Sequence, residues 1–195
     1  MNNNKETVAK PTLEQLHTEL DKVKYKKRYL RTLRSTIYAL ITVAAIAVLV
    51  ATLLLPVLRI YGTSMTPSLY EGNIVVCVKT TQFEQGDIVS FYYNNKVLVK
   101  RVIAFPGDWV DIAQDGTVSV NGTVLDEPYV QELAFGECDI ELPYQVPDGQ
   151  IFVLGDHRAT SADSRSTTIG CIKEEEIVGR IVFRVWPFPD FGKVA

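Results

Sequence analysis

Residues 88–105 read IVSFYYNNKVLVKRVIAF, in which two runs rich in β-branched and aromatic residues flank the pair Asn94-Asn95. Residues of these types favour strands, and a pair of asparagines favours a tight turn between them. The stretch therefore predicts two strands of an antiparallel sheet, of which the second extends from Val97 to Phe105.

Further short β-rich runs, separated by turn signals such as Asn121-Gly122, fill the chain from residue 57 onward. Strands at this spacing are typical of an antiparallel sheet or a folded barrel. We therefore expect a mainly β domain over 57–195, in which the turn-rich segment 121–150 is an inserted loop or small subdomain. The runs lie at residues 74–78, 88–93, 97–105, 109–112, 117–120, 151–154 and 181–186.

The segment before this domain is apolar. Residues 37–55, IYALITVAAIAVLVATLLL, hold no charge over 19 positions. As a helix they would span roughly 28 Å at about 1.5 Å per residue, close to the hydrocarbon thickness of a bilayer. A buried core helix or a cleaved signal peptide would also be apolar, but the polar residues 1–34 precede this segment and no small-x-small site follows it. We expect one transmembrane helix over 35–56.

The distribution of charge predicts the orientation of that helix. Residues 1–34 hold nine Lys or Arg and four Asp or Glu, a balance of +5; the rest carries −8, because the whole chain is −3. By the positive-inside rule, 1–34 is a cytoplasmic basic segment and 57–195 lies outside the plasma membrane. An acidic outer domain argues against nucleic acid as a partner, since nucleic-acid binding calls for a basic patch.

Residues 12–34 also carry a helical pattern. Leucine and valine recur there at alternating three- and four-residue steps, interrupted by Lys27 and Arg34. This spacing is typical of a short coiled coil that would support weak self-association. It is equally typical of an amphipathic helix whose basic side chains face the headgroups of a lipid bilayer. The apolar positions are Leu13, Leu16, Leu20, Val23 and Leu30.

Ser64 and Lys100 are the residues that indicate chemistry. Ser64 lies in the segment GTSMTPSL, and Lys100 lies in the apolar run VLVKRVIA. Period-two alternation places Lys100 on the same strand face as Leu98, Val102 and Ala104. Burial on such a face lowers the pKa of a lysine, so that its neutral amine can take the proton of a serine nucleophile. A lysine whose stem covers apolar surface while its ammonium stays in water would fit the same pattern.

A polar loop at 155–165, GDHRATSADSR, places opposite charges two positions apart with hydroxyls between them. Such a loop can fix a site through ion pairs and hydrogen bonds, although a solvated surface loop would have the same composition. The loop contains His157, one of two histidines in the chain; the other, His17, precedes the apolar segment. Only His157 could therefore serve a serine–histidine site.

The serine segment, the lysine strand ending in FPGD and the 155–165 loop, in this order behind one apolar span, resemble bacterial type I signal peptidases. The resemblance runs from about Arg59 to Phe188. It implies a membrane-anchored serine endopeptidase that removes signal peptides from exported preproteins on the outer face of the membrane. This chemistry needs no metal and no organic cofactor.

The resemblance also implies roles for individual residues. Ser64 matches the nucleophile, Lys100 matches the general base, and Ser161 matches the hydroxyl that orients the lysine amine. The backbone amide of Ser64 would belong to the oxyanion hole. Supporting charge pairs match Arg101, Asp156, Asp163 and Arg165. The substrate pockets would be lined by Ile60, Met65, Leu69, Leu98 and Val99, each of which would equally suit an ordinary core.

Two positions depart from the family pattern. Gly62 stands where some members carry a serine whose hydroxyl completes the oxyanion hole, so the second donor is left open. His157 stands where asparagine is usual, and the pair Asp156-His157 invites a serine–histidine interpretation. Adjacent residues of an extended segment point to opposite faces, however, so Asp156 is poorly placed to orient His157. We therefore expect Lys100 to be the base.

The chain contains three cysteines. Cys77, Cys138 and Cys171 lack CxxC spacing and allow at most one disulfide, and no zinc site is expected.

A cytosolic serine–lysine self-cleaving regulator would lack the apolar span. A noncatalytic relative that assists the assembly of surface structures would be expected to have lost Ser64 or Lys100.

Overall fold

The computed structural model describes residues 12–194, so residues 1–11 of the predicted basic segment lie outside the described residues. The chain divides into two compact units, Met1–Leu49 and Val50–Ala195.

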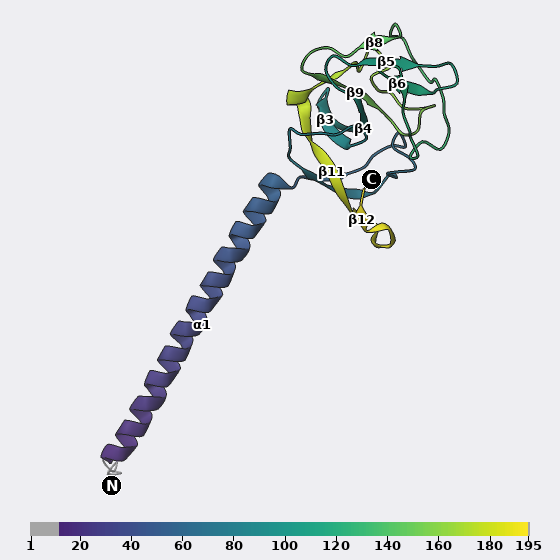
Figure 1. Cartoon of the computed structure of the whole chain (residues 1–195). Helices are drawn as coiled ribbons and strands as arrows, with labels where there is room; N and C mark the ends of the chain where they lie inside the picture. The colour runs from purple at the N-terminus through teal and green to yellow at the C-terminus, as the bar shows by residue number, and fades with distance from the viewer. Residues whose placement is uncertain (1–11, 195) are drawn as a thin grey trace, which may run out of the picture. The chain divides into compact units, whose positions relative to one another are not determined.

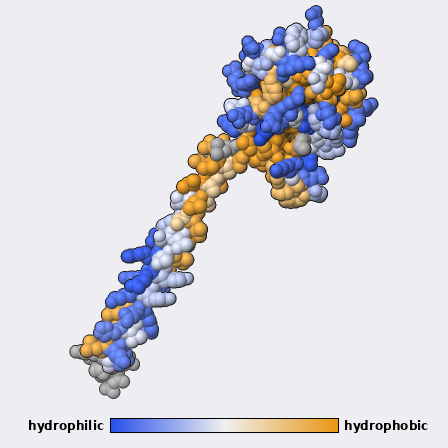
Figure 2. Space-filling view, viewed as in Figure 1, coloured by the Kyte–Doolittle hydropathy of each residue, from blue (hydrophilic) through white to orange (hydrophobic). Residues whose placement is uncertain are grey.

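A single helix, α1, runs without interruption from Leu13 to Leu54 (Figure 1). It begins with a reciprocal cap in which the Thr12 amide donates to Gln15 Oε1 and the Gln15 amide donates to Thr12 Oγ1. It ends just before Pro56, which cannot continue a helix. Figure 2 shows the hydrophilic N-terminal half of α1 and its apolar second half. By length and composition, α1 can cross a membrane.

The second unit is built from β-strands, and among the residues described these strands are joined only by antiparallel pairings. The larger sheet has the order β1-β2-β11-β3-β4-β9-β10, and β12 also pairs with β11. Its strands are β1 (Val57–Arg59), β2 (Ile74–Val78), β3 (Ile88–Tyr93), β4 (Lys96–Ala104), β9 (Gln150–Leu154), β10 (Ile172–Lys173), β11 (Ile177–Trp186) and β12 (Gly192–Lys193). Short 3-10 helices lie at η1 (Glu174–Glu176) and η2 (Phe188–Asp190). The prediction of a mainly β, antiparallel fold after one apolar helix is confirmed.

The β3–β4 hairpin forms around Asn94 and Asn95, whose φ angles are 43° and 64°. Asparagine tolerates this left-handed region, and two such residues in succession give the turn that matches the twist of paired strands. The register sets Tyr93 opposite Lys96 and Ile88 opposite Arg101.

The second half of β4 is enclosed on both faces. Residues from Lys100 to Ala104 are all buried: Val102 packs in one core cluster, Ile103 and Ala104 pack in another, and β9 pairs along the edge of β4 from Arg101 onward. The predicted alternation fails at its end: a register shift between Val102 and Ala104 brings Ala104 into the same core cluster as Ile103. A bulge adds one residue to one strand, so residues beyond it change face.

A smaller sheet has the order β7-β6-β5-β8. Its strands are β5 (Trp109–Ile112), β6 (Val118–Val120), β7 (Thr123–Val124) and β8 (Tyr144–Gln145). The turn-rich segment 121–150 thus supplies β7 and β8, while β5 and β6 precede it. Val110 and Val118 of this sheet pack with Phe152 and Leu154 of β9 in one buried cluster. The smaller sheet therefore covers the strands that lead into the polar loop at 155–165.

Candidate active site

The serine segment is fixed by its apolar neighbours. Met65 and Leu69 are buried in a core cluster with Ile60 and Val75, while Ser64 remains half-exposed. The Leu69 amide donates to the Met65 carbonyl at 2.8 Å, and the Ser64 carbonyl accepts a hydrogen bond from the His157 amide at 3.1 Å. Burial on one side and backbone pairing on the other leave the Ser64 hydroxyl at the surface of a rigid turn.

Lys100 meets this hydroxyl from β4. Its Nζ atom lies 2.7 Å from Ser64 Oγ, and the residue is only 4% exposed. The pKa of Lys100 is lowered from 10.5 to about 8, chiefly by burial; the charges of Asp163 and Asp156 oppose this shift, and the Arg165 charge contributes to it. A substantial fraction of neutral amine near neutral pH is what a general base requires.

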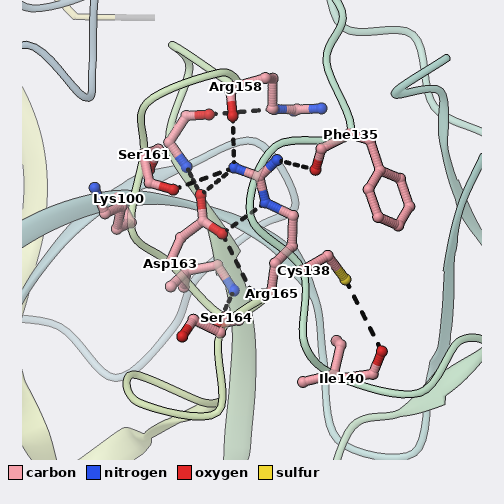
Figure 3. Close-up of polar contacts among 12 residues, drawn as sticks. Lys100, Phe135, Cys138, Ile140, Arg158, Ser161, Asp163, Ser164 and Arg165 are labelled. Atoms are coloured by element: carbon pink, nitrogen blue, oxygen red, sulfur yellow. Dashed lines mark hydrogen bonds and ion pairs between the residues drawn. The ribbon is translucent and has the colours of Figure 1, made fainter. Parts of the chain in front are cut away.

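Two buried ion pairs lie beside Lys100. Arg101 pairs side-on with Asp156, with Nε 2.9 Å from Oδ1 and Nη2 2.7 Å from Oδ2. Arg165 pairs with Asp163 in the same manner, at 2.8 Å and 2.9 Å. Figure 3 shows Asp163 and Arg165 linked beside Ser161, with Lys100 next to them.

A third buried pair completes the cluster. The two terminal guanidinium nitrogens of Arg158, Nη1 and Nη2, donate to the Glu127 carboxylate at 2.9 Å and 2.5 Å. Each buried arginine therefore has its own carboxylate, and the cluster is balanced without Lys100. Protonating Lys100 would add an uncompensated buried charge, which favours the neutral amine.

Gly155 brings the polar loop against the Ser64 segment. Its amide donates to Asp163 Oδ2 at 3.0 Å. A Cβ atom at this position would lie 2.1 Å from Ser161 Oγ and 2.6 Å from the Ser64 carbonyl oxygen. Only a residue without a side chain allows the two segments to approach this closely.

The remaining predicted residues occupy distinct environments. Ser161 Oγ is buried and has no hydrogen-bond partner among the described residues. Gly62 is exposed with a φ of 80°, and no atom lies within 4 Å of its would-be Cβ. The His157 imidazole contacts Thr160 Oγ1 through Nδ1, so the structure pairs this ring with a hydroxyl of its own loop.

A groove of about 610 Å³ runs past Ser64 and Lys100. Four of the predicted pocket residues line it: Ile60, Met65, Leu98 and Val99. The fifth, Leu69, is not among the lining residues, because its side chain is fully buried in the core beneath the serine segment. The groove is bounded by residues 57–65 on one side and by 96–100 on the other.

Sequence reasoning missed Glu127, Tyr129, Arg158 and Gly155 as parts of this site. The segment Glu127-Pro128-Tyr129 lies within a stretch that its turn residues marked only as a loop. A charged residue and a tyrosine flanking a proline gave no indication of which arginines they would meet. The glycine of the polar loop carried a signal, since it stands directly before Asp156, but its contact with Ser64 depends on the fold.

A family of known proteins matches most of this chain. Residues 33–186 match the family described as "Signal peptidase, peptidase S26". The chain belongs to this signal peptidase family. It is therefore a serine endopeptidase that cleaves signal peptides, and its apolar N-terminal helix fits the membrane anchoring of signal peptidases. The noncatalytic alternative is not favoured.

Individual relatives span bacteria and plants. The chain is 40% identical to Signal peptidase IB of Staphylococcus aureus (strain COL) over 152 residues, which cover 68% of this chain and 78% of that protein. It is 37% identical to Thylakoidal processing peptidase 1, chloroplastic, of Arabidopsis thaliana, over 76% of this chain and 47% of that protein. A crystal structure of a signal peptidase I from Enterococcus faecalis V583 shares 29% identity, with a TM-score of 0.44, over 51% of this chain and 96% of that one.

Proposed function

We propose that Ser64 is the nucleophile and Lys100 the general base of this signal peptidase, which releases exported preproteins on the outer face of the plasma membrane. The observation that carries the assignment is the 2.7 Å contact between Lys100 Nζ and Ser64 Oγ, made by a lysine that is 4% exposed. Nucleophile and base within hydrogen-bond reach, with the base desolvated, is the arrangement that activates a serine hydroxyl.

The reaction follows from this contact. Neutral Lys100 takes the proton of Ser64 Oγ as the oxygen attacks the scissile carbonyl carbon, giving a tetrahedral oxyanion. The lysine ammonium then returns the proton to the leaving amine, and the peptide bond breaks to leave an ester on Ser64. A water molecule attacks this ester with Lys100 again as base, which releases the signal peptide and restores the serine.

The backbone amide of Ser64 is a donor for the oxyanion. An amide fixed in a rigid turn stabilises developing charge without reorganisation. The Ser64 turn is held by the buried Met65 and by the hydrogen bond from the His157 amide. Gly62 offers no side-chain donor, so the second donor stays unassigned.

The groove suits an extended peptide. Lys96–Val99 of β4 pair with β3 on one side, and on the other side the described pairing with β9 starts only at Arg101. A substrate segment can therefore add as a strand along this free edge, its backbone bonded to β4 and its side chains directed into the groove. Ile60, Met65, Leu98 and Val99 give the groove an apolar lining, which suits small apolar residues such as alanine.

Charge supports the orientation of the enzyme in the membrane. The balance of +5 over residues 1–34 favours a cytoplasmic N-terminus, and the remainder of the chain carries −8. The preproteins would then be cut after they emerge on the opposite side. The anionic leaflet attracts the basic part of α1 in this orientation.

Cleavage of a preprotein with an Ala-x-Ala site tests the assignment. The detergent-solubilised wild type should release a mature protein whose N-terminus, read by mass spectrometry, follows that site, and Ser64→Ala should release none. Thr66→Ala is the matched control, because the Thr66 hydroxyl donates to the neighbouring Thr63 carbonyl at 2.8 Å and takes no part in the Ser64–Lys100 contact. Equal cleavage by wild type and Ser64→Ala would reject Ser64 as the nucleophile.

A further inference from the structure

The loop that follows β7 reaches all three buried arginines behind the Ser64–Lys100 contact. Glu127 binds Arg158, and its side chain is only 4% exposed. The ring of Tyr129 lies over Arg101, with 3.8 Å between Cζ and the ring centroid. The Phe135 carbonyl accepts a hydrogen bond from Arg165 Nη1 at 2.7 Å (Figure 3). The loop from 125 to 136 therefore contacts the charged cluster at each of these three arginines.

Arg101 holds the two halves of the site together. Beyond its pair with Asp156, its guanidinium donates to the Ser68 hydroxyl at 3.0 Å and to the Gly86 carbonyl at 2.6 Å. Ser68 belongs to the serine segment, and Asp156 immediately precedes the residue whose amide binds the Ser64 carbonyl. Because Arg101 also follows Lys100 in β4, its position sets that of the base relative to the nucleophile.

We propose that Tyr129, held in place by Glu127, is a positioning residue of this peptidase: its ring covers the Arg101 guanidinium and so fixes the serine segment, the lysine strand and the 155–165 loop in one arrangement. The proposal rests on the assigned roles of Ser64 and Lys100.

The contacts of Tyr129 suit this role. An aromatic face over a guanidinium is attracted to the cation, more strongly where water is excluded. The Tyr129 hydroxyl donates to Glu127 Oε1 at 2.9 Å, and the same carboxylate binds Arg158. Burial, followed by the nearby Glu127 charge, raises the pKa of Tyr129, so its hydroxyl stays a neutral donor.

Removing the Tyr129 ring would change the pKa of Lys100 by admitting water to the charged cluster. The charged groups that bear on Lys100 are Asp163, Arg165 and Asp156, and burial outweighs all of them. Without the ring, water reaches Arg101 and Asp156 and hydrates the cluster. Lys100 then loses part of its desolvation, and its pKa rises toward its ordinary value.

The test is the pH dependence of peptide cleavage by folded variants. For the wild type, kcat/KM should rise with pH through about 8, the pKa of Lys100. Tyr129→Leu should lower kcat about tenfold or more, because small misplacements of reacting groups are costly. It should leave KM unchanged, since Tyr129 does not line the groove. It should also move the rising limb of the profile of kcat/KM against pH to higher pH. Tyr129→Phe keeps the ring and should keep the wild-type limb.

Controls separate positioning from stability. Tyr92→Leu removes a ring that is 61% exposed and should change neither kcat nor the limb. A loss of folded protein lowers the apparent kcat without moving the limb. If Tyr129→Leu does not fold by circular dichroism, Tyr129→Met, whose longer and unbranched side chain adapts to the space of the ring, carries the test.

The proposal is overturned if the folded Leu or Met variant has the wild-type kcat and limb, or if Tyr129→Phe shifts the limb as far as Tyr129→Leu. Its failure differs from failure of the proposed function. If only the Tyr129 proposal fails, Ser64→Ala is still inactive. If the proposed function fails, Ser64→Ala retains activity.

Discussion

Arg101 and Asp156 form a side-on ion pair between side chains that are 2% and 1% exposed. Arg101 follows Lys100 in β4, and Asp156 precedes His157, whose amide binds the Ser64 carbonyl. The pair therefore links the strand that carries Lys100 to the loop that contacts Ser64. A charge-assisted, two-bond pair is directional, so it also limits how far these segments can shift.

Asp156→Asn should destabilise the β-sheet domain by about 3–5 kcal/mol, because it leaves the Arg101 charge buried without its carboxylate. Urea unfolding in detergent measures the loss. Glu175→Gln is the control, since Glu175 lies 3.9 Å from Lys173 in a pair that is 79% and 57% exposed; such pairs contribute little. Similar small effects for both substitutions would contradict a stabilising role for the buried pair.

Gly155→Ala should reduce kcat by about 100-fold while leaving a folded protein. The added Cβ would overlap Ser161 Oγ and the Ser64 carbonyl oxygen, at 2.1 Å and 2.6 Å, and must push these groups away. Gly192→Ala is a matched control, because nothing lies within 4 Å of its would-be Cβ. Steady-state kinetics on a peptide substrate give both values, and an active Gly155→Ala enzyme would show that this close approach is dispensable.

Ser161→Ala should lower kcat without lowering the free energy of unfolding. Its hydroxyl is buried and unpartnered among the described residues, so its removal breaks no hydrogen bond and relieves a desolvated polar group. Activity should fall because the same hydroxyl is expected to orient the Lys100 amine. Kinetics and urea unfolding on one preparation separate the two effects. Full activity in Ser161→Ala would remove Ser161 from the site.

The stability of the wild type should rise with pH between about 8 and 10.5, the folded-state and ordinary pKa values of Lys100. In that window the unfolded chain binds the lysine proton and the folded chain does not, so raising the pH favours the folded state. The total is about 3 kcal/mol, at about 1.4 kcal/mol per pKa unit. Lys100→Met should lack this rise when urea unfolding is repeated across the range. An identical rise in both proteins would show that other groups cause it.

Local patterns in the sequence predict much of this fold. The Asn94-Asn95 turn and the alternation before Val102 are properties of neighbouring residues, and the structure contains both the hairpin and a buried Lys100. The bulge before Ala104 depends on pairing with β9, in which Ala104 lies opposite Phe152, a residue far along the chain. No local pattern reports that distant register.

The candidate site likewise contains both a pair of neighbouring residues and pairs of residues distant in the sequence. Asp163 and Arg165 are two residues apart and pair within their loop, as their spacing suggests. Arg101 and Asp156 are 55 residues apart and meet because β4 pairs with β9. Arg158 and Glu127 are 31 residues apart, and their pairing depends on how the smaller sheet packs against β9. Composition revealed the charges, whereas only the fold assigns each charge its partner.

The most direct measurement is kcat/KM for Lys100→Met and His157→Asn on the same peptide substrate, with both variants shown to be folded. If Lys100 is the base, Lys100→Met loses detectable cleavage while His157→Asn stays near wild type, because the His157 imidazole contacts Thr160 and its backbone amide still binds the Ser64 carbonyl. An inactive His157→Asn beside an active Lys100→Met would contradict the serine–lysine assignment and make His157 the base.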